Sequence, residues 1–225
     1  FSTSILGNKG NLDISIVKSS LMLLVFKYDA LRTSIVMPKT GNQAIQVLLK
    51  EREIEFNQFD LSDKSETEAR KNIEDIKRKD KERGFHLDKD SLMRVTLIKL
   101  TEEKYNIIWS AHHIILDGWC MSLILRDFLN YYEILCKDNN LNVLMSKVKD
   151  EKKHILSPKD YIEHIEKLDK KRGMAYWEQL LKDYDNTDKI PSIIKQNTRD
   201  KRIESITNYL DSVTTENIKT CASQN

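Results

Sequence analysis

The most informative part of the sequence is YNIIWSAHHIILDGW, residues 105–119. Its first seven residues are mostly apolar, β-branched or aromatic, which predicts a strand buried on both faces near the middle of a sheet. Side chains on a strand alternate between its faces, so we expect His112 and His113 to point in opposite directions. Only one of the two can then face a given reaction chamber, and the adjacent pair is poorly suited to hold a metal ion.

The residues that end this stretch indicate acyl transfer. Imidazole has an ordinary pKa near working pH, so it can accept a proton from an attacking amine or hydroxyl, or orient it. Asp117 can fix a turn or pair with a buried cation, and Gly118 lets the backbone approach a substrate closely. The alternative is a pair of core histidines at a strand end, followed by an ordinary Asp-Gly turn.

Composition limits the classes of protein to consider. The chain has 225 residues with 40% hydrophobic content, enough for one substantial core or two small ones. Its 37 basic and 35 acidic residues give a formal net charge of +2, which makes no general case for nucleic-acid binding. The three cysteines are odd in number and lack metal-type spacing, so we expect no disulfide framework, no bound metal and a cytoplasmic location. No apolar run approaches a membrane-spanning length and no signal peptide precedes the first strand, so no membrane partner is expected.

Hydrophobic periodicity and turn residues predict alternating helices and strands, and therefore an α/β fold. Residues 93–100 and 105–115 are separated by a short polar turn, which predicts an antiparallel hairpin with the histidines at its far end. Further strands are expected at residues 1–6, 31–37, 44–49 and 54–59. Helices are expected after Asp13, from Glu66 to Gly84, at residues 119–136, and after Ser157 with a break at Gly173. Residues 137–154 are expected to form a surface loop and residues 183–202 a linker.

Three blocks of the sequence resemble one family. HHIILDGW at residues 112–119 resembles the His-His-x-x-x-Asp-Gly signature of condensation domains in nonribosomal peptide synthetases, which are similar to chloramphenicol acetyltransferase. KYDALRTS at residues 27–34 is similar to the family's Arg-His-Glu-x-Leu-Arg-Thr block, with Lys27 and Tyr28 in place of its first two residues. SPKDY at residues 157–161 and the later Tyr-Trp pair resemble a third stretch. The resemblance implies a chloramphenicol acetyltransferase-like lobe, a mixed β-sheet flanked by helices.

The resemblance also implies roles for individual residues. It gives the catalytic role to His113 alone and a structural role to His112. It pairs Asp117 with Arg32, and a buried arginine needs such a partner in any fold. It leaves room beside Gly118 for a phosphopantetheine arm. The chain itself is expected to bind no cofactor, because phosphopantetheine is attached to the partner carrier proteins.

The implied reaction is amide-bond formation between carrier-bound aminoacyl and peptidyl thioesters. The implied partners are donor and acceptor peptidyl carrier proteins, and the adenylation domain and C-terminal lobe of the same synthetase. Two alternatives stay open: a free-standing acyltransferase that uses coenzyme A thioesters, and a catalytically silent docking lobe. An epimerisation domain shares the histidine signature, but WCMSL at residues 119–123 is more similar to a condensing domain.

The length of the chain indicates one lobe of such a domain. A complete condensation domain has two lobes and is roughly twice this size, whereas a single core rarely exceeds about 250 residues. We therefore expect residues 1–184 to form the N-terminal lobe, and residues 185–225 to form a linker and the start of a truncated C-terminal lobe. Because the transfer site lies between two lobes, the chain by itself is expected to be inactive.

Overall fold

The computed structural model describes residues 2–6, 12–39, 43–184 and 208–224. Its contacts divide the chain into two units, Phe1–Leu168 and Asp169–Asn225. The first unit contains both β-sheets and the histidine motif, so it holds the candidate site. The second unit contains helices α6 (Lys170–Leu180) and α7 (Ser212–Gln224).

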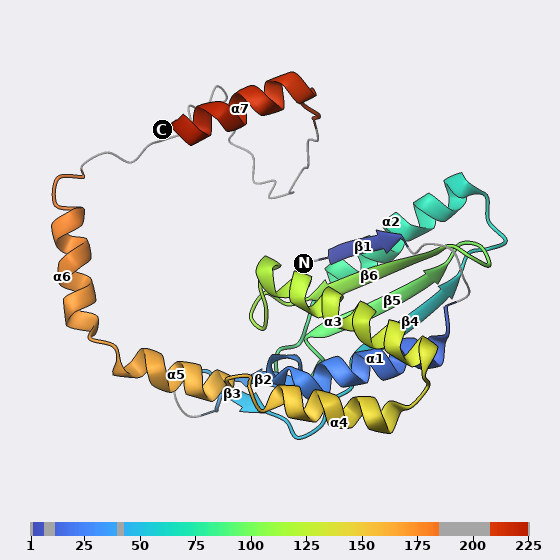
Figure 1. Ribbon diagram of the computed structural model, residues 1–225, viewed down its shortest axis with the longest axis horizontal. Coiled ribbons are helices and arrows are strands. Elements are labelled where there is room, and N and C mark those ends of the chain that lie inside the picture. Colours follow the sequence, from blue (N-terminus) through green and yellow to red (C-terminus); the bar gives the residue numbers. More distant parts are fainter. Residues whose placement is uncertain (1, 7–11, 40–42, 185–207, 225) are drawn as a thin grey trace. The chain divides into compact units, whose positions relative to one another are not determined.

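A mixed four-stranded sheet forms the centre of the first unit, in the order β1-β6-β5-β4 (Figure 1). Strand β6 (Tyr105–Ala111) runs antiparallel to both β1 (Ser2–Leu6) and β5 (Met93–Lys99). Strand β5 runs parallel to β4 (Glu55–Asp60), and a helix forms the crossover between these two strands. All 7 residues of β6 are buried, which confirms the predicted strand with two buried faces, and the predicted hairpin is also confirmed.

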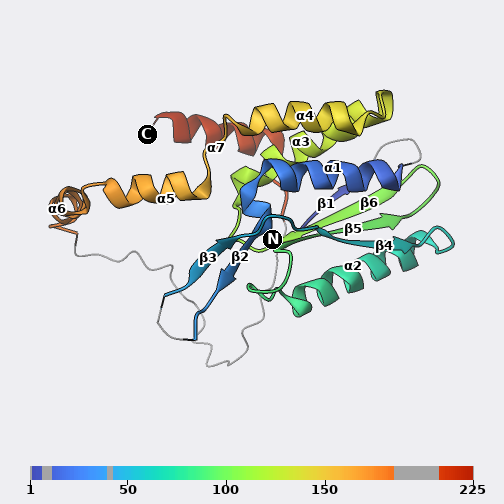
Figure 2. The same cartoon turned by 90° about the horizontal axis from the view of Figure 1, so that it is seen from below.

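Helices cover both faces of this sheet (Figure 2). On one face, Ile107 and Trp109 of β6 join the larger hydrophobic core with the helices that follow β1 and the histidine motif. On the other face, Ile108 packs with Ile73 of the crossover helix. The helices of the first unit are α1 (Ile14–Lys27), α2 (Glu66–Arg83), α3 (Gly118–Lys137), α4 (Leu141–Lys152) and α5 (Pro158–Lys167).

A second, smaller sheet pairs β2 (Thr33–Val36) with β3 (Ile45–Leu48) in antiparallel register. A 3-10 turn, η1 (Asp29–Arg32), joins α1 to β2. A strand was predicted at residues 31–37, but β2 begins two residues later, at Thr33, because Leu31 belongs to the 3-10 turn and is buried there.

The helix ends follow signals that are visible in the sequence. The Asp13 carboxylate accepts hydrogen bonds from the first turn of α1. Ser65 and Ser157 each begin a capping box, at α2 and α5. Gly84 ends α2 with a φ of 61°, in the left-handed region that favours glycine.

Two predictions about the second half of the chain are wrong. Residues 137–154 are not a surface loop, because α4 places Leu144 and Val148 one turn apart and buries both in the main core. The helical break falls at Leu168 and not at Gly173, which lies inside α6.

The predicted boundary after residue 184 adjoins residues 185–207, which lie outside the described residues, so it stays a prediction. Most of the expected linker at residues 183–202 also lies there. Among the helices of the described part of the chain, none combines the length and apolar character needed to cross a membrane.

Candidate active site

The histidine motif lies between the end of β6 and the start of α3. Strand β6 ends at Ala111, and residues 113–115 form a turn before α3 begins at Gly118. The strand therefore stops before His112, so side-chain alternation does not govern the two histidines. Both histidines line one cavity, and the expectation that their side chains face opposite sides stays a prediction.

This cavity, which we call the histidine cavity, has a volume of about 910 Å³. That volume is in the range of small-molecule sites. One wall is formed by α2 and the residues that follow it, and the other by the last residues of β6 and the two histidines. His113 is exposed and His112 is half-buried.

Backbone contacts hold His112 in place. Its N–H donates to the carbonyl of Leu92 at 2.9 Å, and its Nδ1 accepts from the N–H of Ile114 at 3.1 Å. The edge of its ring meets Phe85, with 6.2 Å between the ring centroids. Since Nδ1 acts as an acceptor, a neutral His112 carries its proton on Nε2. These contacts give His112 a part in the local structure of the turn.

Arg94 is a site component that the sequence reasoning missed. It is 1% exposed, and its Nε donates to Asp80 Oδ1 at 2.8 Å. Its other nitrogens donate to the carbonyls of Gly84 and Asp80, at the C-terminus of α2, where a cation is electrostatically favoured. The guanidinium also stacks on Phe85, 4.0 Å from the ring centre. Arg94 thus fixes the end of α2 and the Phe85 ring beside His112. A charged residue within an apolar strand was the sequence signal that could have revealed this role.

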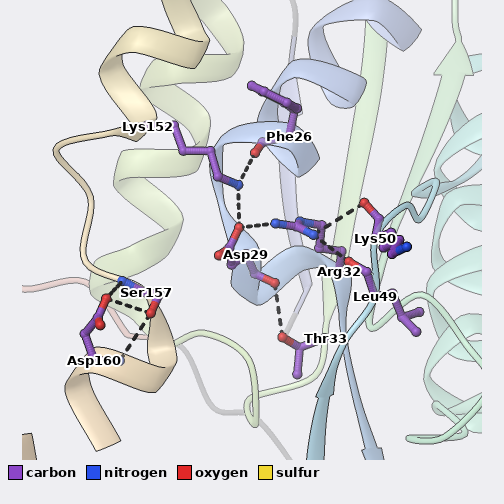
Figure 3. Close-up of polar contacts among 9 residues, drawn as sticks. All are labelled: Phe26, Asp29, Arg32, Thr33, Leu49, Lys50, Lys152, Ser157 and Asp160. Carbon is purple, nitrogen blue, oxygen red and sulfur yellow. Dashed lines mark hydrogen bonds and ion pairs between the residues drawn. The ribbon is translucent and has the colours of Figure 1, made fainter. Parts of the chain in front are cut away.

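The predicted ion pair between Arg32 and Asp117 is wrong. The Asp117 carboxylate is exposed and accepts a hydrogen bond from the N–H of Cys120 at 2.9 Å, capping α3. This backbone hydrogen bond holds the pKa of the Asp117 carboxyl below its ordinary value. Arg32 instead pairs with Asp29, in its own 3-10 turn, and donates to the carbonyl of Leu49 (Figure 3). A site-shaping role for Arg32 and Asp117 stays a prediction, but without contact between them.

Asp29 is the acidic centre of the contacts around this turn (Figure 3). Lys152 of α4 pairs with its carboxylate and also donates to the carbonyl of Phe26 at 2.7 Å. Burial alone would raise the pKa of the Asp29 carboxyl, but its bonds to Lys152 and Arg32 hold that pKa below its ordinary value. Asp29 therefore joins η1 to α4 through a partly buried ion pair.

Lys27 and Tyr28, which depart from the family block, meet at Asp127 of α3. The carboxylate Oδ2 of Asp127 accepts from Lys27 Nζ at 2.7 Å and from Tyr28 Oη at 2.6 Å. Lys27 also pairs with Glu151 at 2.7 Å. Burial and the bond to Asp127 raise the pKa of Tyr28 to about 12. The two unusual residues thus bind α1 to α3 and α4.

The mixed sheet, the helices on both of its faces and the histidine turn define an α/β lobe. The Condensation domain model matches residues 1–225, and the chain belongs to this family of nonribosomal peptide synthetase domains. Both the predicted fold class and the predicted family are confirmed.

Curated relatives agree with this family. Tyrocidine synthase 2 of Brevibacillus parabrevis is 35% identical over 96% of the chain, which covers 6% of that protein. Bacitracin synthase 3 of Bacillus licheniformis is 30% identical over 100% of the chain and 3% of that protein. The chain spans only a small share of the length of these relatives.

Solved structures show the same fold. The cyclization-docking bidomain of the EpoB synthetase from Sorangium cellulosum matches with a TM-score of 0.60 and 20% identity, over 80% of this chain and 34% of that one. The epimerization domain from the third module of tyrocidine synthetase B matches with a TM-score of 0.64 and 20% identity, over 88% and 43%.

Proposed function

We propose that this chain carries the catalytic histidine of a condensing domain and that its site forms amide bonds between carrier-bound thioesters. The observation that supports this most directly is the position of His113. It is exposed on the wall of the histidine cavity, at a strand end, in a chain that belongs to the condensation family. His113 is the more exposed of the two histidines, whereas His112 is half-buried, so His113 is the better candidate for the reaction.

In the proposed reaction, the amine of an acceptor aminoacyl thioester attacks the carbonyl carbon of a donor thioester. The new C–N bond forms as the C–S bond breaks, and the donor's phosphopantetheine thiol leaves. The proton lost by the amine ends on that thiol, with His113 accepting it on the way or orienting the amine. Apart from its chain neighbours and the backbone of α3, no atom of the described residues lies within 4 Å of the position that a Cβ would take at Gly118, which leaves open space beside the turn for the arm.

The proposal includes partners that the chain itself does not contain. Donor and acceptor peptidyl carrier proteins would supply phosphopantetheine, and an adenylation domain would stand in the same cytoplasmic synthetase. Residues 1–184 would form the N-terminal lobe, and residues 185–225 the linker and the start of the C-terminal lobe.

The test is His113→Ala in the intact parent module, assayed with loaded carrier proteins. We expect peptide-bond formation to fall by about 100-fold or more, the typical contribution of a positioned acid or base. The melting temperature should stay unchanged because the side chain is exposed. The matched variant is His112→Ala, which removes the acceptor for Ile114 and should lower the melting temperature. Wild-type turnover by His113→Ala, with a folded but inactive His112→Ala, would reverse the two roles.

A second experiment separates the proposal from its alternatives. The 225-residue chain should show no measurable condensation by itself, since orienting two thioesters needs both lobes. Adding the C-terminal half in cis should restore turnover. Robust acyl transfer from coenzyme A thioesters by the chain alone would favour the free-standing acyltransferase. Variants that lose carrier binding without losing any turnover would favour the docking lobe.

A further inference from the structure

The buried guanidinium of Arg94 is bound at three points by the end of α2. Its Nε donates to Asp80 Oδ1 at 2.8 Å, and its two terminal nitrogens donate to the carbonyls of Gly84 at 2.8 Å and of Asp80 at 3.1 Å. Arg94 is 1% exposed and does not line the histidine cavity, whereas its partners Asp80 and Gly84 do. Arg94 therefore acts on the cavity only through the residues that it holds.

Phe85 is the cavity residue that Arg94 holds most completely. The Gly84 carbonyl belongs to the peptide group that joins Gly84 to Phe85, so the bond from Arg94 fixes the backbone at Phe85. The guanidinium also lies over the Phe85 ring, 4.0 Å from its centre, where a cation is attracted to the aromatic face. A planar guanidinium can donate hydrogen bonds at its edge and stack at its face at the same time, and a lysine ammonium cannot.

The Phe85 ring in turn contacts His112. The two rings meet almost at right angles, at 88°, with 6.2 Å between their centroids, and aromatic rings favour this geometry. In this orientation the His112 Nδ1 accepts from the N–H of Ile114 at 3.1 Å. His113 lies between His112 and Ile114 in the sequence, so this hydrogen bond closes the backbone around His113.

The start of β5 provides two separate supports for His112. The carbonyl of Leu92, directly before β5, accepts from the backbone N–H of His112 at 2.9 Å. Arg94, the second residue of β5, supports the His112 ring through Phe85. A change at Arg94 would therefore release the ring while the backbone contact stays in place.

We propose that Arg94 and Phe85 are positioning residues for His113. Arg94 holds the Phe85 ring, and this ring keeps the His112 Nδ1 on its backbone partner. The inference rests on the proposed function, because it concerns the placement of the histidine that the reaction uses. A catalytic group misplaced by about 1 Å can cost about 100-fold in rate, so the effect should be seen in kcat.

The first experiment measures condensation in the intact parent module with loaded carrier proteins. Arg94→Lys keeps the charge but loses the stacked contact, and Phe85→Leu keeps apolar bulk but loses the ring. Each should lower kcat about 10-fold or more and leave KM within about two-fold. Phe85→Tyr retains the ring and should retain kcat. If Arg94→Lys fails to fold, Phe85→Leu still tests the inference, because Phe85 is only half-buried.

Arg83→Lys is the matched control. Arg83 also joins the end of α2 to the sheet, through an ion pair with Glu55 of β4 in which a second bond, from Nη2 to Oε2, measures 2.8 Å. This ion pair includes neither Arg94 nor Phe85. Arg83→Lys should therefore leave kcat unchanged. An equal loss of kcat in Arg83→Lys would mean that any loosening of α2 slows the reaction, which contradicts a specific role of Arg94.

The second experiment observes the His112 ring without turnover. Long-range proton–nitrogen NMR spectra of the 225-residue chain at about pH 8.5, where free histidine is neutral, report which ring nitrogen carries the proton. The His112 signal, assigned by its loss in His112→Ala, should show the proton on Nε2, since Nδ1 is an acceptor. Arg94→Lys and Phe85→Leu should shift this signal toward a mixture of both tautomers, and Arg83→Lys should not.

The outcomes are distinct. A lower kcat together with a changed His112 signal supports the inference. Unchanged kcat in both variants, a rise of KM without loss of kcat, or a His112 signal that neither variant changes would overturn it. Failure of the proposed function is seen separately, as wild-type turnover by His113→Ala, because the His112 signal depends on Arg94 and Phe85 whether or not the reaction occurs.

Discussion

Asp29 takes the place that the sequence reasoning gave to Asp117. Arg32 and Asp29 are three residues apart in one 3-10 turn, so their pairing needs no distant element, whereas the Asp117 carboxylate is already occupied as the cap of α3. The arginine and the aspartate side chains are only 16% and 15% exposed. Their contact is therefore more than a solvated surface pair.

A double-mutant cycle tests this assignment. Arg32→Met and Asp29→Asn should show a coupling free energy of about 0.5–3 kcal/mol in denaturant unfolding, as residues in contact do. Arg32→Met and Asp117→Asn should be additive, because asparagine keeps the helix cap and the two residues do not touch. Coupling in the second cycle and additivity in the first would restore the pairing of Arg32 with Asp117.

The raised pKa of Tyr28 predicts that the free energy of unfolding changes at alkaline pH. Its pKa is about 12 in the folded chain and about 10 when unfolded, so the folded state keeps a proton that the unfolded state loses first. The contribution is fully present below pH 10 and is lost as pH rises toward 12. The free energy of unfolding should fall over that window, and Tyr28→Phe should make the fall shallower. An identical slope in Tyr28→Phe would contradict the raised pKa of Tyr28, which burial and the bond to Asp127 cause together.

Sequence reasoning located the histidine motif but not its contacts. The apolar run before His112 placed it at a strand end, because periodicity reports burial. The strand was predicted to reach residue 115, four residues too far, because the apolar sequence does not show where hydrogen bonding between strands ends. Arg94 and Asn106 were not identified from the sequence. Arg94 pairs with Asp80, and the Oδ1 of Asn106 has no partner among the described residues; both facts depend on neighbours that are distant in the sequence.

Among the helices and strands, α2 is the one whose C-terminal end matters most to the site. Gly84 has φ 61° and ψ −151°, a region that is open almost only to glycine, and its carbonyl accepts from Arg94. Gly84→Ala should cost about 1–3 kcal/mol from the backbone alone, because no atom of the described residues, apart from its chain neighbours, lies within 4 Å of its Cβ position.

Gly173, inside α6, is the matched control for this variant. Outside the backbone of α6, the described residues also place no atom within 4 Å of its Cβ position, so Gly173→Ala should stabilise the chain by up to about 1 kcal/mol. Thermal denaturation of both variants checks that Gly84→Ala lowers the melting temperature and that Gly173→Ala raises it. A neutral Gly84→Ala would show that the end of α2 tolerates another conformation.

Elements with explicit end signals were predictable, and α4 was not. Ser157 marked the start of α5 through its capping box. The start of α2 was predicted from Asp63 and Glu66, and its capping box is formed by Ser65 and Glu68. Helix α4 is polar except for a thin stripe, and its packing on α1 and α3 makes Leu144 and Val148 core residues. Tertiary contacts therefore decided an element that local propensity left open.

At the scale of the whole molecule, α5 presents an apolar face without burying any residue. Tyr161 and Ile162 on this helix are exposed, as is Leu156 just before it. We expect the 225-residue chain to self-associate as its concentration rises. Ile162→Glu should raise the monomer fraction in sedimentation measurements, and Lys159→Glu on the same helix should not. A chain that stays monomeric at all concentrations would contradict this expectation.

The register of the central sheet also sets an order of folding. Strand β1 pairs with β6, where Ser2 lies opposite Ser110, so this contact closes a loop of about a hundred residues. The β5–β6 hairpin closes across a short turn and costs far less chain entropy. During synthesis, β1 leaves the ribosome before β6 and must therefore wait, unpaired with it, until β6 has followed. Chaperones that bind strands not yet paired have their opportunity on β1 in that interval.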